Sequence, residues 1–90
     1  MESTRKVRIV NSSGLHARPC HAIVSAALGF ESSLRVRCAE RDVNGKSILE
    51  LMTLEAAAGA DVLLVAEGAD CAALLDRLEA LFGAGFDESL

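Results

Sequence analysis

The apolar residues of this chain change their spacing along the sequence, and this change limits the folds that the chain can adopt. Val7 and Ile9 alternate with charged residues, which is the period of a strand with one buried face. After residue 19 the apolar residues instead recur three and four positions apart, as on one face of a helix. They are Cys20, Ile23, Val24, Ala27 and Leu28. A strand and a helix that each have one apolar side bury those sides by packing together.

The rest of the chain continues with the same two periods. Residues 34–38 alternate as a strand, residues 41–43 can return antiparallel after a tight turn, and residues 62–66 form an apolar run of strand length. Two further helices are predicted, one before and one after this last run. The order strand, helix, strand, strand, helix, strand, helix predicts an α+β two-layer sandwich with the helices on one face of the sheet.

Polar residues mark where the two later helices begin. Ser47 and Glu50 form an S-x-x-E capping box, in which each side chain satisfies a backbone N–H of the first turn. Asp70 precedes the last apolar stripe and is positioned to cap its helix. Gly83 is predicted to end that helix.

Length and composition limit the class of protein. A chain of 90 residues, 51% of them hydrophobic, can form one domain whose core needs neither disulfide nor metal. We therefore expect a single domain over residues 1–90, and a monomer. The three cysteines are odd in number and form no C-x-x-C pair, which suits reduced thiols in a cytosol. No apolar run reaches about 18 residues, the length of a membrane span, so we expect a cytoplasmic protein without membrane insertion.

Charge is distributed unevenly along the chain. Residues 1–46 hold eight Lys and Arg against four Asp and Glu, whereas residues 47–90 hold one against nine. The net charge of −4 argues against nucleic acid as a partner, because phosphate backbones bind to basic domains. A basic surface around Arg18 could instead meet an acidic partner or a phosphate.

The scarcest residue types gather in one segment, since both histidines and the only proline lie within residues 16–21. His16 precedes the first predicted helix, whose opening N–H groups lack partners and whose dipole favours an anion. Arg18 adds a cation suited to phosphate oxygens, and Ser13 adds a hydroxyl. A neutral imidazole beside an anion site and a cation suits reversible phosphoryl transfer.

Two other interpretations of His16 remain open from spacing alone. It can be an ordinary histidine in a turn, because isolated patterns are weak evidence. His16, Cys20 and His21 can also be metal ligands, since residues four apart on a helix can chelate. However, Cys20 belongs to the apolar stripe and no fourth ligand is evident, so we expect no metal site.

The segment Gly14-Leu15-His16-Ala17-Arg18-Pro19 resembles the active-site motif of HPr, the histidine-containing phosphocarrier of the bacterial phosphotransferase system. The resemblance covers nearly the whole chain. It includes Gly29-Phe30, residues 44–49 and Ala66-Glu67-Gly68. It implies an open-faced sandwich in which a four-stranded antiparallel sheet carries three helices on one face.

The resemblance also implies a function. His16 matches the histidine that accepts a phosphoryl group on Nδ1 from Enzyme I, which is charged from phosphoenolpyruvate. Enzyme II A-type domains then receive the group. Arg18 matches the arginine that supports the phosphate, and Ser13 and Ala17 match positions beside it. Such a protein is a carrier rather than an enzyme, and it needs no cofactor of its own.

The predicted second helix holds further candidate residues. Ser47 has a structural role as a cap, but its surroundings also resemble the serine that HPr kinase/phosphorylase phosphorylates in many bacteria. Ile48 and Met52 have the spacing of a core stripe. In the family, however, the positions of Ile48, Leu49 and Met52 lie partly exposed and contact partner proteins. We assign no function to His21 or to the three cysteines.

Three functions remain open at this stage. The chain can serve sugar uptake, as HPr does, or the nitrogen-related regulatory branch, whose carrier is called NPr. The tail around Phe86 resembles NPr-type tails, whereas Lys46-Ser47-Ile48 looks more like kinase-regulated HPr. A regulatory binding module without phosphotransfer is the alternative from another class, and the presence of His16 argues against it.

Overall fold

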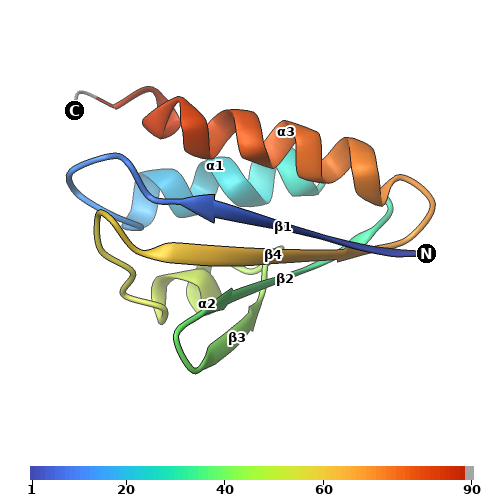
Figure 1. Ribbon diagram of the computed structural model, residues 1–90, viewed down its shortest axis with the longest axis horizontal. Coiled ribbons are helices and arrows are strands. Elements are labelled where there is room, and N and C mark those ends of the chain that lie inside the picture. The colour runs from blue at the N-terminus through green and yellow to red at the C-terminus, as the bar shows by residue number, and fades with distance from the viewer. Residues whose placement is uncertain (89–90) are drawn as a thin grey trace.

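The computed structural model describes residues 1–88 and confirms the predicted order of elements (Figure 1). A single 3₁₀ turn, η1, follows the last helix. The elements are β1 (Glu2–Arg8), α1 (Ala17–Ala27), β2 (Ser33–Cys38), β3 (Arg41–Asn44), α2 (Ile48–Met52), β4 (Asp61–Glu67), α3 (Cys71–Gly83) and η1 (Gly85–Asp87).

The four strands form one antiparallel sheet in the order β1-β4-β2-β3. The helices cover one face of this sheet (Figure 1). Helices α1 and α3 lie side by side along it, and α2 contacts α1 and the edge strand β3. This is the open-faced α+β sandwich expected from the sequence. Because β1 and β4 are neighbours, the loop after β1 and the loop before β4 lie at the same end of the molecule.

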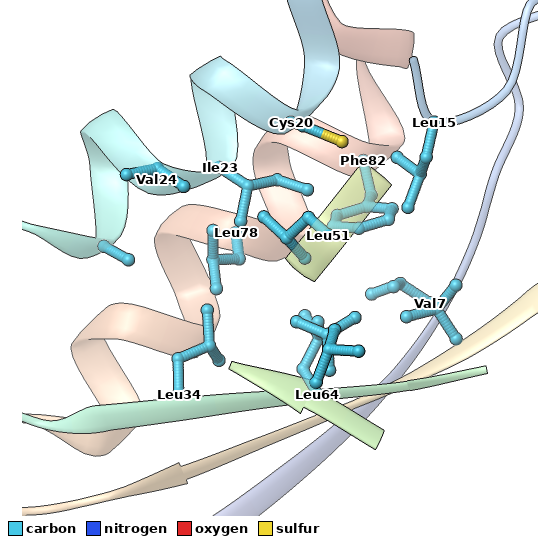
Figure 2. Packing of buried hydrophobic residues seen from close by; sticks show 14 of the residues in the cluster. Val7, Leu15, Cys20, Ile23, Val24, Leu34, Leu51, Leu64, Leu78 and Phe82 are labelled. Atoms are coloured by element: carbon cyan, nitrogen blue, oxygen red, sulfur yellow. The ribbon is translucent and has the colours of Figure 1, made fainter. Parts of the chain in front are cut away.

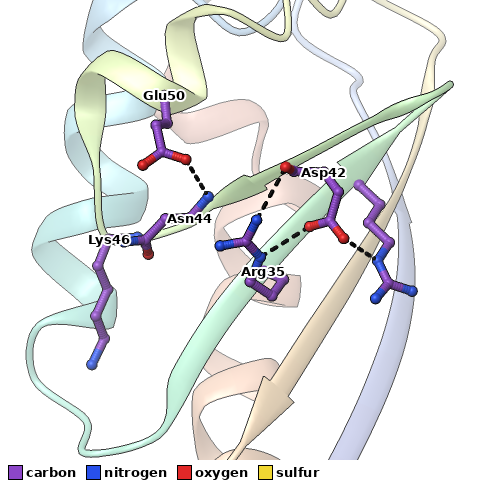
Figure 3. A network of polar contacts seen from close by, with 6 residues as sticks. Arg35, Asp42, Asn44, Lys46 and Glu50 are labelled. Carbon is purple, nitrogen blue, oxygen red and sulfur yellow. Dashed lines mark hydrogen bonds and ion pairs between the residues drawn. The ribbon is translucent and has the colours of Figure 1, made fainter.

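Strand alternation separates the core from the open face of the sheet. Leu34 of β2 and Leu64 of β4 are buried beneath the helices (Figure 2), and Val36 of β2 is fully buried as well. The charged residues that alternate with the buried residues of β1 and β2 are exposed. They are Lys6, Arg8, Arg35 and Arg37. On the open face, Asp42 of β3 accepts hydrogen bonds from Arg35 and Arg37 (Figure 3), and these bonds lower the pKa of its carboxyl group.

The cap predicted for the last helix is wrong in detail. Asp70 occupies the N-cap position of α3, but its side chain makes no cap hydrogen bond. The carboxylate instead accepts from the N–H groups of Glu31 and Ser32, at 2.9 Å each, and from the Ser32 hydroxyl. These bonds, led by the Ser32 hydroxyl, lower the pKa of Asp70. Asp70 therefore ties the loop after α1 to the start of α3.

Only half of the predicted capping box forms at α2. Ser47 Oγ accepts from the Glu50 N–H at 3.2 Å, as a cap does. The Glu50 carboxylate does not return to the Ser47 N–H but accepts from the Asn44 N–H at 3.0 Å (Figure 3). The Ser47 N–H donates to the Asn44 carbonyl instead. The capping-box pattern pairs the Glu50 carboxylate with the Ser47 N–H. In the structure both groups instead bond to the backbone of Asn44, in the turn before α2.

Gly83 is the last residue of α3, as predicted. The chain continues beyond this helix into η1. Phe86 in η1 has φ of +57° and turns back onto the core, where its ring packs against Phe82 with centroids 4.9 Å apart. This turn directs the residues after α3 toward the loop that follows β1, at the same end of the molecule (Figure 1).

Candidate functional site

The loop between β1 and α1 is fixed by a close backbone contact. Gly14 has φ of +70°, and a Cβ at this position would lie 2.5 Å from the carbonyl oxygen of Ala56. The next N–H, that of Leu15, donates to the same carbonyl at 2.9 Å. The buried Leu15 side chain then anchors the loop in the core. These contacts determine where the chain enters α1.

His16 is the N-cap residue of α1, with extended backbone angles and no side-chain cap bond. Its ring side chain is 42% exposed. No acidic residue lies in the first turn of α1, and the N–H groups of Ala17 and Arg18 have no acceptor within residues 1–88. The positive end of the helix dipole and two available donors therefore lie beside an accessible imidazole, which suits an anion.

The other residues predicted around His16 lie on the surface next to it in the chain. Ser13 is exposed in the loop, and Ala17 and Arg18 are exposed in the first turn of α1. Ser13 and Arg18 therefore lie within a few residues of the start of α1, where the N–H groups of Ala17 and Arg18 are available. His21 is exposed one turn further along, and no described contact assigns it a role.

A metal site is not assembled from these residues. Cys20 is fully buried, and burial raises the pKa of its thiol, so it does not form an exposed pair with His16. Residues 1–88 hold no cluster of three or more His, Cys, Asp or Glu side chains placed to bind a metal ion.

Two residues of the site were missed by the sequence analysis. Nε2 of His16 lies 2.8 Å from Oε2 of Glu88. The other oxygen of the Glu88 carboxylate accepts from Nδ2 of the fully buried Asn11, also at 2.8 Å. Asn11 Nδ2 donates in addition to the Gly14 carbonyl at 2.9 Å. No local pattern could reveal these contacts, because they join the loop after β1 to residues beyond α3.

Comparison with known proteins gives the family of this chain. The family profile described as "PTS HPr component phosphorylation site" matches residues 3–84. This chain belongs to the HPr family. It is 40% identical over 84 residues to the phosphocarrier protein HPr of Treponema pallidum, covering 93% of this chain and 96% of that protein. It is 35% identical to the phosphocarrier protein NPr of Shewanella violacea, covering 94% and 93%.

The fold agrees with this assignment. A crystal structure of HPr from Thermoanaerobacter tengcongensis superposes with a TM-score of 0.92 and 36% identity, covering 98% of this chain and 99% of that one. Proteins of the HPr family are phosphocarriers rather than catalytic enzymes, and the sequence-based prediction of a carrier is confirmed at that level. None of the helices in the described part of the chain has the length and apolar character needed to span a bilayer.

The residues predicted to bind partners of an HPr protein separate into two kinds. Leu49 and Met52 of α2 are 80% and 42% exposed, whereas Ile48 is half-buried and packs on the core. The fully buried residue of this short helix is Leu51. The core stripe that spacing assigned to Ile48 and Met52 is thus wrong for Met52, since α2 is only five residues long and turns that side chain outward.

Ser47 lies away from the His16 end of α1. Lys46 Nζ donates to the carbonyl of Phe30, which follows α1, whereas the Leu15 N–H just before His16 contacts Ala56, which follows α2. The start of α2 therefore lies beside the C-terminal end of α1, and the chain after α2 returns toward His16.

Proposed function

We propose that His16 accepts a phosphoryl group on Nδ1 from phosphorylated Enzyme I and passes it to enzyme II A-type domains. One observation carries this proposal: an accessible imidazole stands at the N-terminus of an eleven-residue helix with free N–H groups beside it. A phosphoryl group on this ring would lie where the dipole and these donors favour negative charge.

The neighbouring side chains suit the charge of the transferred group. Arg18 brings a guanidinium that can bind phosphate oxygens in pairs, and the Ser13 hydroxyl can donate to a third oxygen. The N–H of Ala17 needs no particular side chain at that position. Because transfer between two nucleophiles relies on positioning and charge stabilisation, these groups need no cofactor. The three cysteines are free in the described part of the chain, which supports a reducing, cytoplasmic setting.

An exposed apolar patch supports the proposed docking of partners. Leu49 and Met52 place apolar surface on α2, and charged or polar residues surround it. Such a patch suits brief association with several proteins. Ile48 contributes less, because part of its side chain already packs on the core.

The test is phosphorylation in vitro. The protein is incubated with Enzyme I, magnesium and phosphoenolpyruvate, and its intact mass is measured. We expect a gain of one phosphate that is lost in acid and absent in His16→Ala. His21→Ala is the matched control, since that histidine is exposed on the same helix, and it should gain the phosphate normally. No gain in the wild-type protein with an active Enzyme I would contradict the proposal and favour a binding module without phosphotransfer.

We propose a second, regulatory phosphorylation on Ser47 by HPr kinase/phosphorylase. Ser47 is half-buried at the start of α2, and a phosphate there would face the helix N–H groups. The Lys46 side chain is bound to the Phe30 carbonyl, so it is not free to pair with the phosphate without moving. Phosphate that survives acid and disappears in Ser47→Ala, but not in Ser12→Ala, is the expected result; labelling that persists in Ser47→Ala would refute it.

The branch served by this carrier follows from its acceptors. The similarity to both an HPr and an NPr protein leaves sugar uptake and nitrogen-related regulation as the two candidates. The tail around Phe86 supports the second, whereas Lys46-Ser47-Ile48 supports the first. Loss of phosphate from the carrier to a purified sugar-type A domain, compared with a nitrogen-type A domain, distinguishes them. The faster transfer identifies the branch.

A further inference from the structure

The clearest feature outside the known motif is the carboxylate bound to the ring of His16. Glu88 Oε2 lies 2.8 Å from Nε2 of His16, whereas the phosphoryl group is proposed for the other nitrogen, Nδ1. The contact therefore leaves the proposed site of attack open. The Glu88 side chain is only 12% exposed, so this carboxylate is held in place and partly shielded from water.

Two independent contacts hold Glu88 in this position. Its other oxygen accepts from Asn11 Nδ2 at 2.8 Å, and Asn11 is itself fully buried and bound to the Gly14 carbonyl. The preceding turn is anchored by the buried ring of Phe86 on Phe82. Phe86 and Asp87 both have positive φ angles, +57° and +61°, a costly backbone conformation for residues with side chains.

We propose that Glu88 is a positioning residue for phosphoryl transfer, which keeps a proton on Nε2 of His16 and stabilises the positive charge that the ring gains. A carboxylate can only accept a hydrogen bond, so Nε2 must carry a hydrogen, and in the neutral ring Nδ1 then carries the lone pair. Carboxylates orient catalytic and metal-binding imidazoles in this way. The inference rests on the proposed phosphorylation of His16 on Nδ1.

The transfer step balances with Glu88 in this role. The Nδ1 lone pair forms a bond to phosphorus, while the bond between phosphorus and the donor breaks and leaves its electron pair on the donor. The ring keeps its hydrogen on Nε2 and becomes cationic. The Glu88 carboxylate then faces a positive ring instead of a neutral one, so its interaction strengthens during the reaction. The reverse sequence passes the phosphoryl group to the acceptor.

The charged groups around the ring are consistent with this assignment. Glu88 is the one carboxylate within residues 1–88 that hydrogen-bonds to the His16 ring, and no acidic residue lies in the first turn of α1. The carboxylate on this ring thus lies at Nε2, and Nδ1 has no hydrogen-bond partner within residues 1–88.

The experiment compares Glu88→Ala and Glu88→Gln with Asp87→Asn, an exposed carboxylate on the adjacent residue. The first readout is the ring of His16 by NMR, with nitrogen shifts and the Nε2–H proton signal. We expect a slowly exchanging Nε2–H signal in the wild-type protein and in Asp87→Asn. Glu88→Ala should lose that signal to exchange with water, while backbone amide shifts outside the tail and the loop after β1 stay unchanged.

The second readout is the rate of phosphorylation by Enzyme I. We expect Glu88→Ala to be about tenfold slower, the effect of losing one charge-assisted hydrogen bond on a half-exposed ring. Glu88→Gln should fall between Glu88→Ala and the wild type, because it keeps an oxygen acceptor but loses the charge. Asp87→Asn should react at the wild-type rate.

The outcomes separate this inference from the proposed function. Normal phosphorylation of His16 together with wild-type rates in both Glu88 variants would overturn the role of Glu88 and leave the carrier function intact. An absent Nε2–H signal in the wild-type protein would overturn it as well. No phosphorylation of the wild-type protein would overturn both, whatever the ring signals show.

Discussion

Nε2 of His16 and a carboxylate oxygen of Glu88 lie 2.8 Å apart, although 72 positions separate the two residues in the sequence. These two residues, far apart in the sequence, come together for two reasons. Helices α1 and α3 pack side by side (Figure 1), and the turn at Phe86 sends the chain back over the start of α1. Glu88 is therefore part of the site, and the start of α1 is contacted both by the loop after β1 and by a residue that follows α3.

The close approach at Gly14 predicts a large loss of stability on adding one methyl group. Gly14→Ala places a Cβ against the Ala56 carbonyl and keeps the positive φ, and we expect a loss of roughly 2–4 kcal/mol. Gly59→Ala is the matched control, since its φ is also positive but no atom lies within 4 Å of the added Cβ. It should lose only about 1 kcal/mol. Urea unfolding measures both, and equal losses would contradict the contact.

The buried side-chain amide of Asn11 predicts that replacing its nitrogen by oxygen lowers the stability of the protein strongly. Nδ2 faces two acceptors, the Gly14 carbonyl and Glu88, so Asn11→Asp sets a buried carboxylate against both. We expect a loss of about 3 kcal/mol in the free energy of unfolding. In the control Asn44→Asp, the side-chain oxygen that accepts from the Lys46 N–H is retained, and the change should stay within about 1 kcal/mol. Comparable losses in both variants would argue against the Asn11 contacts.

Most of the fold could be predicted because each element carries its own signal. The alternation of Leu34 and Val36 gave β2, and the spacing of Ile23 and Ala27 gave α1, since burial on one side is a local property of the sequence. The turns were harder. Glu50 and Asp70 carry cap-forming side chains at the right positions, yet each binds a backbone N–H of another segment, and only the tertiary fold determines which donor is closer.

Only part of the site was predicted, because only part of it is formed by residues that are close together in the sequence. His16, Arg18 and Ser13 are close in the sequence, so a helix start brings them together without further information. Asn11 belongs to the turn-forming run Asn11-Ser12-Ser13-Gly14, and Glu88 is one of two consecutive acidic residues after Phe86. Their contact depends on the packing of α3 and on the turn at Phe86, and neither has a pattern at the level of a few residues.

The carboxylate of Asp70 predicts how stability changes in acid. Hydrogen bonds from Ser32 and Glu31 lower its pKa in the folded state. Since the folded-state pKa lies below that of the unfolded chain, the stabilisation is complete above about pH 4 and is lost as the pH falls through the lower value. Unfolding by urea at a series of pH values should show this loss in the wild-type protein.

Asp70→Asn should lessen the loss of stability that the wild-type protein shows in acid. The variant keeps one acceptor oxygen but cannot be protonated in this range, so its stability should depend less on pH below about 4. Glu40→Gln, which removes an exposed carboxylate in the turn between β2 and β3, should leave the wild-type decline intact. Identical acid curves for the wild type and Asp70→Asn would show that the link between α1 and α3 does not depend on this charge.

Leu49 and Leu51, two positions apart in α2, are predicted to have opposite effects on stability and binding. Leu51 is fully buried, whereas Leu49 is 80% exposed. Leu51→Ala should lose about 2–5 kcal/mol of stability. Leu49→Ala should change stability by less than about 0.5 kcal/mol but weaken binding to Enzyme I by about tenfold, as truncation of an apolar contact residue does. Leu63→Ala is the control, because this leucine of β4 pairs with Lys6 and Arg37 on the open face of the sheet, opposite the helices. Titration calorimetry should show unchanged affinity for Leu63→Ala, and an equal loss in Leu49→Ala and Leu63→Ala would place the docking surface elsewhere.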